Sequence, residues 1–519
     1  MFTAKDKKYI KSHKISLEEI KQQMINFKNG FPKIELENPA LVDDGIILPS
    51  EEQINRWVSD FDYKKSKYSI TKFVPASGAA TRMFAKLYDF LEEYDGSHEQ
   101  YLQLIADKSE DGMNYFFQNI HKLPFYKDLK DHLLLRGYFL DKLIEKCEYK
   151  FILESLLNKD GLNYGELPKA LIKFHSHIES AMTPLEEHLV EAAHYCKSNK
   201  GVSHINFTVS EEYLKMAKKY LKENRRKYEK KHNTKFKISL SVQNKSTDCI
   251  ALDRDRNVVR DEEGLPLLRP SGHGALLMNL NSIKSDITFI KNIDNVLPDR
   301  YKPETYRYKK ALAGLLINIQ EKVFTYLRTL KKSNVQTPNK LNEILDFCNT
   351  KLFVKHPKEV YHFGAETLVK YLIGVLDRPI RVCGMVLNEG EPGGGPFWVK
   401  NKDMSISLQI IEKSQIDTSN PEQKKILEAS THFNPVDIVC GTKNEKGKHY
   451  DLSKFINPET GFISTKTYKG EKITIQELPG LWNGSMAYWN TIFVEVPSET
   501  FSPVKTVQDL FKIEHRNIL

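Results

Sequence analysis

The chain has 519 residues, of which 40% are hydrophobic and 28% charged, and its formal net charge is +9. This composition is that of a large folded protein, and the length allows about two to four domains. The modest positive charge favours anionic small molecules as partners, and without a basic tail or an Arg-rich block it does not indicate nucleic-acid binding.

The N-terminus and the cysteines bear on the cellular compartment. Residues 1–8 contain no apolar core of a signal peptide, and no apolar run in the sequence is long enough to span a bilayer. The six cysteines are scattered and form no C-x-x-C pair, so that neither a cysteine zinc site nor a disulfide framework is expected. We therefore expect a cytoplasmic protein with no membrane partner.

Residues 1–66 are predicted to form an N-terminal helical region. Ser16 and Ser50 each stand three residues before Glu or Gln, which is the spacing of a capping box at a helix start. Apolar residues of helical period follow each of them. The β-prone run 68–74 comes next and leads into a loop of small residues.

The loop 75–83 reads Pro-Ala-Ser-Gly-Ala-Ala-Thr-Arg-Met and lies between a predicted strand and a predicted helix. Small side chains let phosphate oxygens approach backbone N–H groups, and a helix N-terminus adds positive potential. Arg82 offers a planar, permanently charged fork for phosphate oxygens. The alternative is an ordinary strand-to-helix turn with a surface arginine. The pattern indicates a candidate phosphate-binding loop.

Two long stretches have helical periodicity and interrupt the strands, and we predict helical insertions at about 84–160 and 303–376. The other segments alternate between helices and β-prone runs, the latter at 205–209, 236–242, 287–293, 380–386, 405–411 and 492–496. This alternation predicts an α/β fold whose central sheet is mostly parallel.

Polar residues follow two of the predicted strands. Asp294 and Asn295 come after the run 287–293, and Gln243 comes after the run 236–242. Ligands of open α/β sheets bind beyond the carboxyl ends of the strands, so we expect these side chains at a ligand site.

The order of the motifs resembles that of the sugar-1-phosphate nucleotidyltransferases, or NDP-sugar pyrophosphorylases, and most closely their UDP-sugar branch. Each motif is weak by itself, and the resemblance rests on their order along the chain. The motifs are Gly78 with Thr81, Arg82 and Met83 in the loop, then Pro168-Lys169, Gln243, Gly272-His273-Gly274, Asp294-Asn295, Glu412-Lys413-Ser414 and the C-terminal stretch 501–510. The chain also looks like a member of an uncharacterised bacterial family.

The resemblance implies a mixed, mostly parallel central sheet of the nucleotide-diphospho-sugar transferase (GT-A-like) type. It implies one catalytic domain over 67–510 that contains both helical insertions, followed by a C-terminal tail at 511–519. The implied reaction is attack by a sugar 1-phosphate oxygen on the α-phosphorus of a nucleoside triphosphate, with UTP favoured. The products are an NDP-sugar and pyrophosphate, and Mg²⁺ is the implied cofactor.

The resemblance also implies roles for single residues. The phosphates would be bound by Arg82, Lys169 and Lys505, and the metal by Asp294. The residues that would bind the nucleotide are Ala76, Ser77, Gly78, Ala79, Thr81, Gln243, Gly272 and Gly274. Gly272 and Gly274 are included because glycines let the base and the ribose lie against the backbone. Sugar binding falls to Glu412, Asn483 and Asn295.

Two departures from the family pattern keep other functions open. Ala80 stands where the family has a second glycine, and its methyl group is expected to crowd a triphosphate. A helical insertion also separates the loop from Lys169. The alternatives are a non-catalytic protein that binds a nucleotide or nucleotide sugar, and a glycosyltransferase. The second would use a D-x-D motif after a strand, and Asp253-Arg254-Asp255 lies in a predicted turn.

Overall fold

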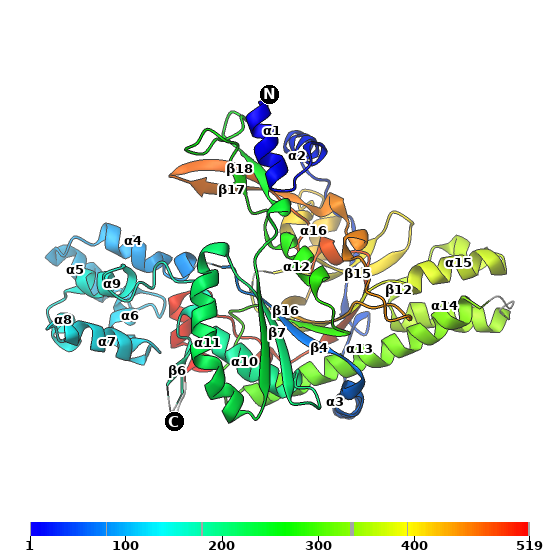
Figure 1. The fold of residues 1–519 in the computed structure, drawn as a ribbon, viewed down its shortest axis with the longest axis horizontal. Helices are drawn as coiled ribbons and strands as arrows, with labels where there is room; N and C mark the ends of the chain where they lie inside the picture. The colour runs from blue at the N-terminus through cyan, green and yellow to red at the C-terminus, as the bar shows by residue number, and fades with distance from the viewer. Residues whose placement is uncertain (1, 79, 178–179, 333–336, 392, 517–519) are drawn as a thin grey trace. The chain divides into compact units, whose positions relative to one another are not determined.

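The computed structural model describes residues 2–78, 80–177, 180–332, 337–391 and 393–516 (Figure 1). The chain divides into two compact units. The first unit consists of Met1–Phe73, Ser241–Ile290 and Tyr308–Val496, and the second of Val74–Leu240, Lys291–Arg307 and Pro497–Leu519. The chain therefore passes between the units several times, and each unit is assembled from segments that are distant in sequence.

The first unit is built on a mixed sheet with the strand order β2-β3-β19-β13-β16-β11-β4. Neighbouring strands pair parallel throughout, except that β16 is antiparallel to both β13 and β11. The strands are β2 (Leu41–Val42), β3 (Gly45–Ile47), β4 (Ile70–Pro75), β11 (Ile287–Ile290), β13 (Ile380–Leu387), β16 (His432–Gly441) and β19 (Asn490–Glu495). The predicted mixed, mostly parallel α/β sheet is confirmed.

Strand β16 is absent from the predicted strands although it is buried along its whole length. Its sequence contains Pro435, which cannot donate to a ladder and argues against a central strand. The register between β16 and β13 shifts between Gly384 and Val386, and Val436 has a φ of 59°. The proline therefore lies at a β-bulge, where no ladder hydrogen bond from its nitrogen is needed.

Two smaller sheets complete the strands of the first unit, with the orders β1-β14-β15-β12 and β10-β9-β18-β17. Their strands are β1 (Leu36–Pro39), β9 (Cys249–Leu252), β10 (Leu268–Arg269), β12 (Val354–Lys355), β14 (Gly395–Lys400), β15 (Ile406–Ile411), β17 (Phe462–Tyr468) and β18 (Glu471–Glu477).

The N-terminal region combines helices with short strands. Helices α1 (Ala4–Ser12), α2 (Leu17–Asn29) and α3 (Glu51–Lys64) are present, and the predicted capping boxes at Ser16 and Ser50 begin α2 and α3. Strands β1 to β3 lie between α2 and α3 and pair with strands of the first unit. Residues 1–66 are therefore not purely helical, because three short strands of weak local pattern are completed by distant partners.

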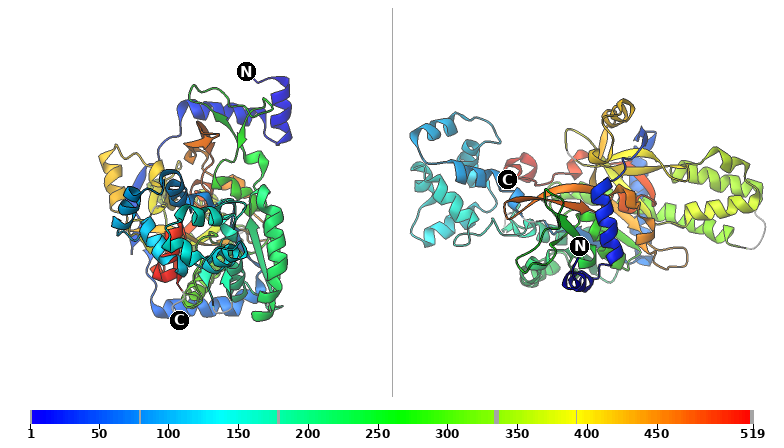
Figure 2. Two further views of the ribbon diagram at one scale, coloured as in Figure 1. Left: turned by 90° about the vertical axis from the view of Figure 1, so that its left-hand side faces the viewer. Right: turned by 90° about the horizontal axis from the view of Figure 1, so that it is seen from above.

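The other helices of the first unit include the second predicted helical stretch. It contains α13 (Lys302–Leu330), which starts in the second unit, α14 (Pro338–Lys351) and α15 (Ala365–Leu376). Figure 2 shows α14 and α15, in yellow-green, side by side. The unit also contains α12 (Leu277–Ser282) and α16 (Pro421–Glu428). Among the described residues, no helix combines the length and the hydropathy needed to cross a bilayer.

The second unit contains two longer strands, β7 (Val202–Thr208) and β8 (Lys235–Ser241), which are neighbours in the strand order. Helix α11 (Leu214–Lys231) connects them, and α10 (Pro184–Tyr195) precedes β7. The predicted capping box at Thr183 and the proline in the first turn are both present in α10. A small hairpin of β5 (His175–Ser176) and β6 (Ala181–Met182) lies just before α10.

The first predicted helical insertion forms a bundle in the second unit (Figure 1). It consists of α4 (Ala85–Glu93), α5 (His98–Ala106), α6 (Met113–Asn119), α7 (Tyr126–Leu135), α8 (Leu140–Glu145) and α9 (Tyr149–Leu157). The bundle shares one hydrophobic core with the C-terminal residues Val504, Leu510 and Phe511. Phe511 packs edge-on against Tyr115 and Phe116, with ring centroids 5.6 and 5.9 Å away. The insertion therefore anchors the C-terminal stretch that carries Lys505.

Candidate functional site

The candidate phosphate loop follows β4 in the second unit, and backbone hydrogen bonds hold it. The N–H of Ala76 donates to the carbonyl oxygen of Thr208 at the end of β7 (2.8 Å), and the N–H of Lys169 donates to that of Gly78 (3.2 Å). Ser77 and Gly78 are exposed. The loop backbone is thus fixed from both sides while its tip remains open.

The rest of the loop turns into a short 3₁₀ helix, η2 (Ala80–Arg82), in which Thr81 and Arg82 are exposed. Ala80 is fully buried, its N–H donates to the carbonyl oxygen of Leu167 (3.3 Å), and its methyl group belongs to the core of the helical insertion. The expected crowding of a phosphate by this methyl group does not arise, because the side chain packs in the core. Ala79 lies outside the described residues.

Lys169 and Asp294 form a partly buried ion pair. The Lys169 Nζ lies 3.1 Å from Asp294 Oδ2, and the two side chains are 14% and 25% exposed. The same Nζ donates to the carbonyl oxygen of Val504 (2.9 Å), and the N–H of Val504 donates to the carbonyl oxygen of Asp294 (3.1 Å). Three segments that are distant in sequence therefore meet at one ammonium group.

The C-terminal stretch runs along the loop and the strand-end residues. The N–H of Val507 donates to the carbonyl oxygen of Met83 (3.0 Å), and the N–H of Ser502 donates to Asn295 Oδ1 (3.3 Å). Asn295, predicted to contact a sugar, is 2% exposed and holds this stretch instead. Lys505 is exposed. The structure thus gathers in one unit Ala76, Ser77, Gly78, Thr81, Arg82, Lys169, Asp294 and the backbone of Lys505.

Asp509 fixes the backbone around Lys505. Its Oδ2 accepts the N–H groups of Lys505 (2.8 Å) and Thr506 (2.7 Å) at the start of η14 (Val507–Phe511). Burial would raise the pKa of Asp509, but the ammonium of Lys512 and the N–H of Thr506 hold it below its usual range. A charged carboxylate therefore orders this turn and leaves the Lys505 side chain exposed.

The chemistry of Asp294 suits Mg²⁺ that is shared with a phosphate ligand. Among the described residues, the only group of three or more His, Cys, Asp or Glu side chains with converging donor atoms is His175, His177 and Glu187, which does not include Asp294. Mg²⁺ is commonly held by one or two carboxylates together with substrate phosphates. A single carboxylate fits that arrangement and does not fit a cage made by the protein alone.

Glu412, Asn483 and His273 come together in the first unit. Asn483 Nδ2 donates to Glu412 Oε1 (2.7 Å), and His273 Nε2 lies 3.8 Å from the same oxygen. The N–H of Leu481 donates to His273 Nδ1 (3.1 Å), so the proton of the neutral imidazole is on Nε2. His273 also stacks on Trp482, with centroids 4.3 Å apart.

Asn483 offers an acceptor to a ligand. It is 3% exposed, and among the described residues its Oδ1 has no hydrogen-bond partner. Buried polar atoms in folded proteins are nearly always bonded, so an unsatisfied amide oxygen beside a carboxylate points to a bound polar group. A carboxylate, an amide oxygen and an imidazole N–H together suit the hydroxyl groups of a sugar.

Packing within the first unit explains the two glycines of the Gly272-His273-Gly274 segment. A Cβ at Gly274 would lie 2.1 Å from the carbonyl oxygen of Pro479. Gly272 has a φ of 76°, and a Cβ there would lie 2.4 Å from Glu477 Oε2. Close approach of a ligand is therefore not needed to account for either glycine.

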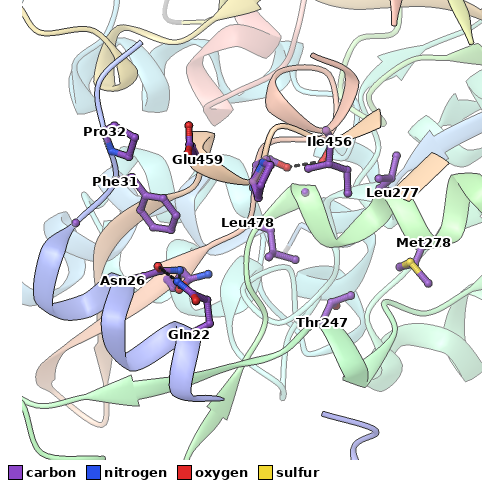
Figure 3. A pocket seen from close by; sticks show the side chains of 16 residues that line it. Gln22, Asn26, Phe31, Pro32, Thr247, Leu277, Met278, Ile456, Glu459 and Leu478 are labelled. Carbon is purple, nitrogen blue, oxygen red and sulfur yellow. Dashed lines mark hydrogen bonds between the residues drawn. The ribbon is translucent and has the colours of Figure 1, made fainter. Parts of the chain in front are cut away.

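A cavity of about 510 Å³ lies in the first unit beside Gly274 (Figure 3). Its walls are mostly apolar, and two amides of α2 lie on one side, where Asn26 Nδ2 donates to Gln476 Oε1 (3.0 Å). Thr247 also lines the cavity, and its Oγ1 accepts a long hydrogen bond from Gln243 Nε2 (3.4 Å). Other lining residues are Gln22, Phe31, Leu277, Met278 and Leu478. A volume of this size suits a small organic ligand.

No sequence motif marks the cavity-lining residues of α2. Gln22 and Asn26 are four residues apart and so share a face of the helix, where Gln22 Nε2 donates to Asn26 Oδ1 (2.9 Å). That spacing is the only local signal, and exposed faces of amphipathic helices commonly carry such pairs.

The D-x-D segment is used to hold a turn. Asp253 Oδ1 accepts the N–H groups of Asp255 (2.9 Å) and Asn257 (2.8 Å), which is a side-chain-capped turn. Asp255 is exposed. These hydrogen bonds explain the presence of Asp253 in the turn without a metal.

Comparisons with known proteins give one family and several similar structures. A family model described as "Domain of unknown function (DUF4301)" matches residues 3–516. A search of the curated proteins finds no match.

The similar structures include pyrophosphorylases, the class that the sequence motifs resemble. One is UDP-glucose pyrophosphorylase from Leishmania major, with 12% identity over 98% of this chain and 79% of that chain and a TM-score of 0.45. Another is UDP-N-acetylglucosamine pyrophosphorylase from Trypanosoma brucei, with 11% identity over 95% of this chain and 74% of that chain and a TM-score of 0.46. A UDP-glucose phosphorylase from Trypanosoma brucei has 12% identity, coverage of 97% and 77%, and a TM-score of 0.43.

Proposed function

The chain belongs to the DUF4301 family, and we propose that it is a nucleotidyltransferase acting on a nucleoside triphosphate, with UTP favoured, and a sugar 1-phosphate. The products are an NDP-sugar and pyrophosphate. The observation that carries the proposal is the Lys169–Asp294 ion pair, with its contacts to the Gly78 loop and to Val504. Phosphoryl chemistry needs aligned cations and a carboxylate for a metal, and little covalent help.

Each cationic group would bind a different phosphate of the two substrates. The exposed tip of the loop, at Ser77 and Gly78, and the guanidinium of Arg82 would hold the leaving β- and γ-phosphates. Lys169 would contact the α-phosphate, where charge develops during the reaction. Lys505 would bind the sugar phosphate as a point charge and bring its attacking oxygen into line.

Asp294 would hold Mg²⁺ together with the phosphates of the nucleotide. The ion would neutralise charge on those phosphates. Lys169 pairs with Asp294 in the structure, so Lys169 becomes available to phosphate when that carboxylate takes another partner. One ion pair of the free protein would thus be replaced by two contacts with the substrate.

The first unit contains groups of the kind that contact a base and a sugar. Its cavity beside Gly274 has apolar walls for a base and amides at one side, and Gln243 reaches the lining residue Thr247. Glu412 and Asn483 would hydrogen-bond the sugar hydroxyls, with the buried Oδ1 of Asn483, unpaired among the described residues, as an acceptor.

The test measures pyrophosphate release by the full chain with Mg²⁺, a panel of nucleoside triphosphates and a panel of sugar 1-phosphates. Release that requires both substrates is the expected result, with the highest rate for UTP. Nucleotide binding without any turnover would identify a non-catalytic binding protein. Release of a nucleoside diphosphate from an NDP-sugar would identify a glycosyltransferase. Either of these two results overturns the proposal.

A methyl group at Gly78 tests the loop without disturbing the fold. A Cβ at this position meets no atom within 4 Å, and the φ lies outside the left-handed region. Gly78→Ala is therefore expected to leave the melting temperature unchanged but to raise KM for the nucleotide about tenfold, the equivalent of one hydrogen bond to phosphate. Gly374→Ala in α15, which also faces open space, is the matched control in the same kinetic assay. An unchanged KM in Gly78→Ala excludes a close approach of phosphate to this residue.

The charge of Glu412 tests the sugar contact. Glu412→Gln keeps an acceptor for Asn483 and removes the negative charge, and hydrogen bonds to charged groups are about twice as strong as neutral ones. KM for the sugar 1-phosphate is expected to rise about tenfold while KM for the nucleotide stays constant. Glu366→Gln, at an exposed ion pair with Lys370, is the control. Equal changes in both KM values would contradict a specific sugar contact.

A further inference from the structure

His175, His177 and Glu187 form a buried cluster in the second unit. His175 begins β5, His177 follows it, and Glu187 lies in the first turn of α10. The side chains of His175 and Glu187 are 0% exposed and that of His177 is 10% exposed. One oxygen, Oε1 of Glu187, lies 2.9 Å from His175 Nδ1 and 2.9 Å from His177 Nε2.

We propose that this cluster binds a divalent transition-metal ion, with Zn²⁺ as the best fit. The three donor atoms lie within 4.8 Å of one another. Two imidazoles and one carboxylate are a common ligand set for Zn²⁺, and ligand atoms of a tetrahedral zinc site are about 3.4 Å apart when each bond is about 2.1 Å. An outward shift of about 0.5 Å by each nitrogen from the carboxylate oxygen is therefore enough to admit the ion.

The second ring nitrogen of each histidine has a hydrogen-bond partner that favours the imidazole tautomer needed to bind a metal. His177 Nδ1 lies 3.3 Å from Asp299 Oδ2, and His175 Nε2 lies 2.9 Å from Nδ1 of His515. The far nitrogen of His515 lies 2.9 Å from the hydroxyl of Ser502. With Nδ1 of His175 and Nε2 of His177 free for the metal, every remaining imidazole N–H has an acceptor. Such second contacts are typical of histidines that bind metals.

The charges around the cluster also favour a cation. Lys302 Nζ lies 2.5 Å from the outer oxygen Oε2 of Glu187 and 2.5 Å from Asp299 Oδ1, so that Oε1 of Glu187 is directed to the imidazoles. Two carboxylates and one ammonium leave one net negative charge when the imidazoles are neutral. The excess charge lies at Asp299, which is 55% exposed and hydrogen-bonded to the cluster, and a cation among the donor atoms offsets it. The alternative occupant is a proton shared by the imidazoles.

An ion at this place would fasten the C-terminal stretch. The contact chain from His175 through His515 reaches Ser502, whose N–H donates to Asn295. Two residues later, the carbonyl oxygen of Val504 accepts from Lys169. The proposed ion is thus structural, and it does not depend on the nucleotidyltransferase proposal, because metal content is measured without any substrate.

The experiment uses the full chain without a histidine tag. The protein is stripped with a chelator, dialysed against Zn²⁺ or Co²⁺, desalted and analysed for metal. About one ion per chain is expected, together with the intense visible absorption of tetrahedral Co²⁺ and a higher melting temperature than that of the stripped protein. His177→Ala and Glu187→Gln are expected to lose the ion.

His432→Ala is the matched control, because His432 is also buried and faces a single carboxylate, Glu495, at 3.1 Å. It is expected to keep the ion. The wild-type measurements decide the matter even if a variant does not fold. Wild-type protein without metal after reloading, or full metal content in both His177→Ala and Glu187→Gln, overturns the proposal and leaves the cluster with a shared proton.

Discussion

Replacing Lys169 by alanine is expected to lower kcat for pyrophosphate release by about 10²- to 10³-fold, the loss seen when one preorganised donor to a transition-state charge is removed. In the free protein its ammonium holds Asp294 and the carbonyl oxygen of Val504. Asp294 keeps access to water in the variant, since its side chain is 25% exposed, whereas Val504 is buried and its carbonyl oxygen loses a donor. The expected loss of unfolding free energy is therefore about 1–2 kcal/mol, which includes the cost of an unpaired buried acceptor.

Lys173→Ala is the control for this variant. Lys173 is four residues further along the chain and also makes an ion pair in the second unit, with Asp128 at 2.6 Å. It should lose similar stability and keep its turnover. Arg82→Ala should behave like Lys169→Ala, since Arg82 is exposed and its loss removes no part of the core. If both Lys169→Ala and Arg82→Ala retain full turnover with saturating substrates, the assignment of these cations to phosphate is wrong.

Replacing Asp294 by asparagine is expected to lower activity about 100-fold at limiting Mg²⁺, with partial recovery at high Mg²⁺. The amide keeps the shape of the side chain but removes the charge that binds a hard cation. The measurement is a Mg²⁺ titration of the rate for both proteins. Its control is Asp128→Asn, which removes the carboxylate of the Lys173 pair and should leave the Mg²⁺ dependence unchanged.

The Mg²⁺ titration of Asp294→Asn also distinguishes a role of Asp294 as a metal ligand from a role in positioning Lys169. Lys169 loses its charged partner in this variant, so a role of Asp294 confined to positioning Lys169 would lower the rate at every Mg²⁺ concentration. A curve shifted to higher Mg²⁺ is the result that indicates a metal ligand. Full wild-type activity in excess chelator would exclude the metal altogether.

Local chemistry in the sequence was sufficient for many single elements. The capping boxes at Ser16, Ser50 and Thr183 predict helix starts that the structure contains, because a cap depends on residues only three positions apart. The alternation of β-prone and helical runs predicts the mixed sheet for the same reason. The small residues around Gly78 likewise predict a loop with an open tip.

Strands that depend on distant partners could not be predicted in this way. Because of Pro435, the sequence does not predict β16 as a strand. The β-bulge that accommodates the proline forms only when β16 pairs with β13. The short strand β3 near the N-terminus has too few residues for a period, and it pairs with β19 at the other end of the chain. Ala80 is a further case, since the sequence placed its methyl group toward a ligand and only the packed helical insertion shows it in the core.

The sequence by itself determined which chemical groups this protein has for its site: a small-residue loop at Gly78, two lysines at 169 and 505, and a strand-end carboxylate at Asp294. Only the tertiary structure decided which of them meet. It pairs Lys169 with Asp294 across 125 positions, and it brings His175 to His515 across 340 positions in a cluster that no sequence motif indicates. Periodicity and propensity act over one or two helical turns. Contacts over such separations depend instead on the order of strands and on which faces are buried.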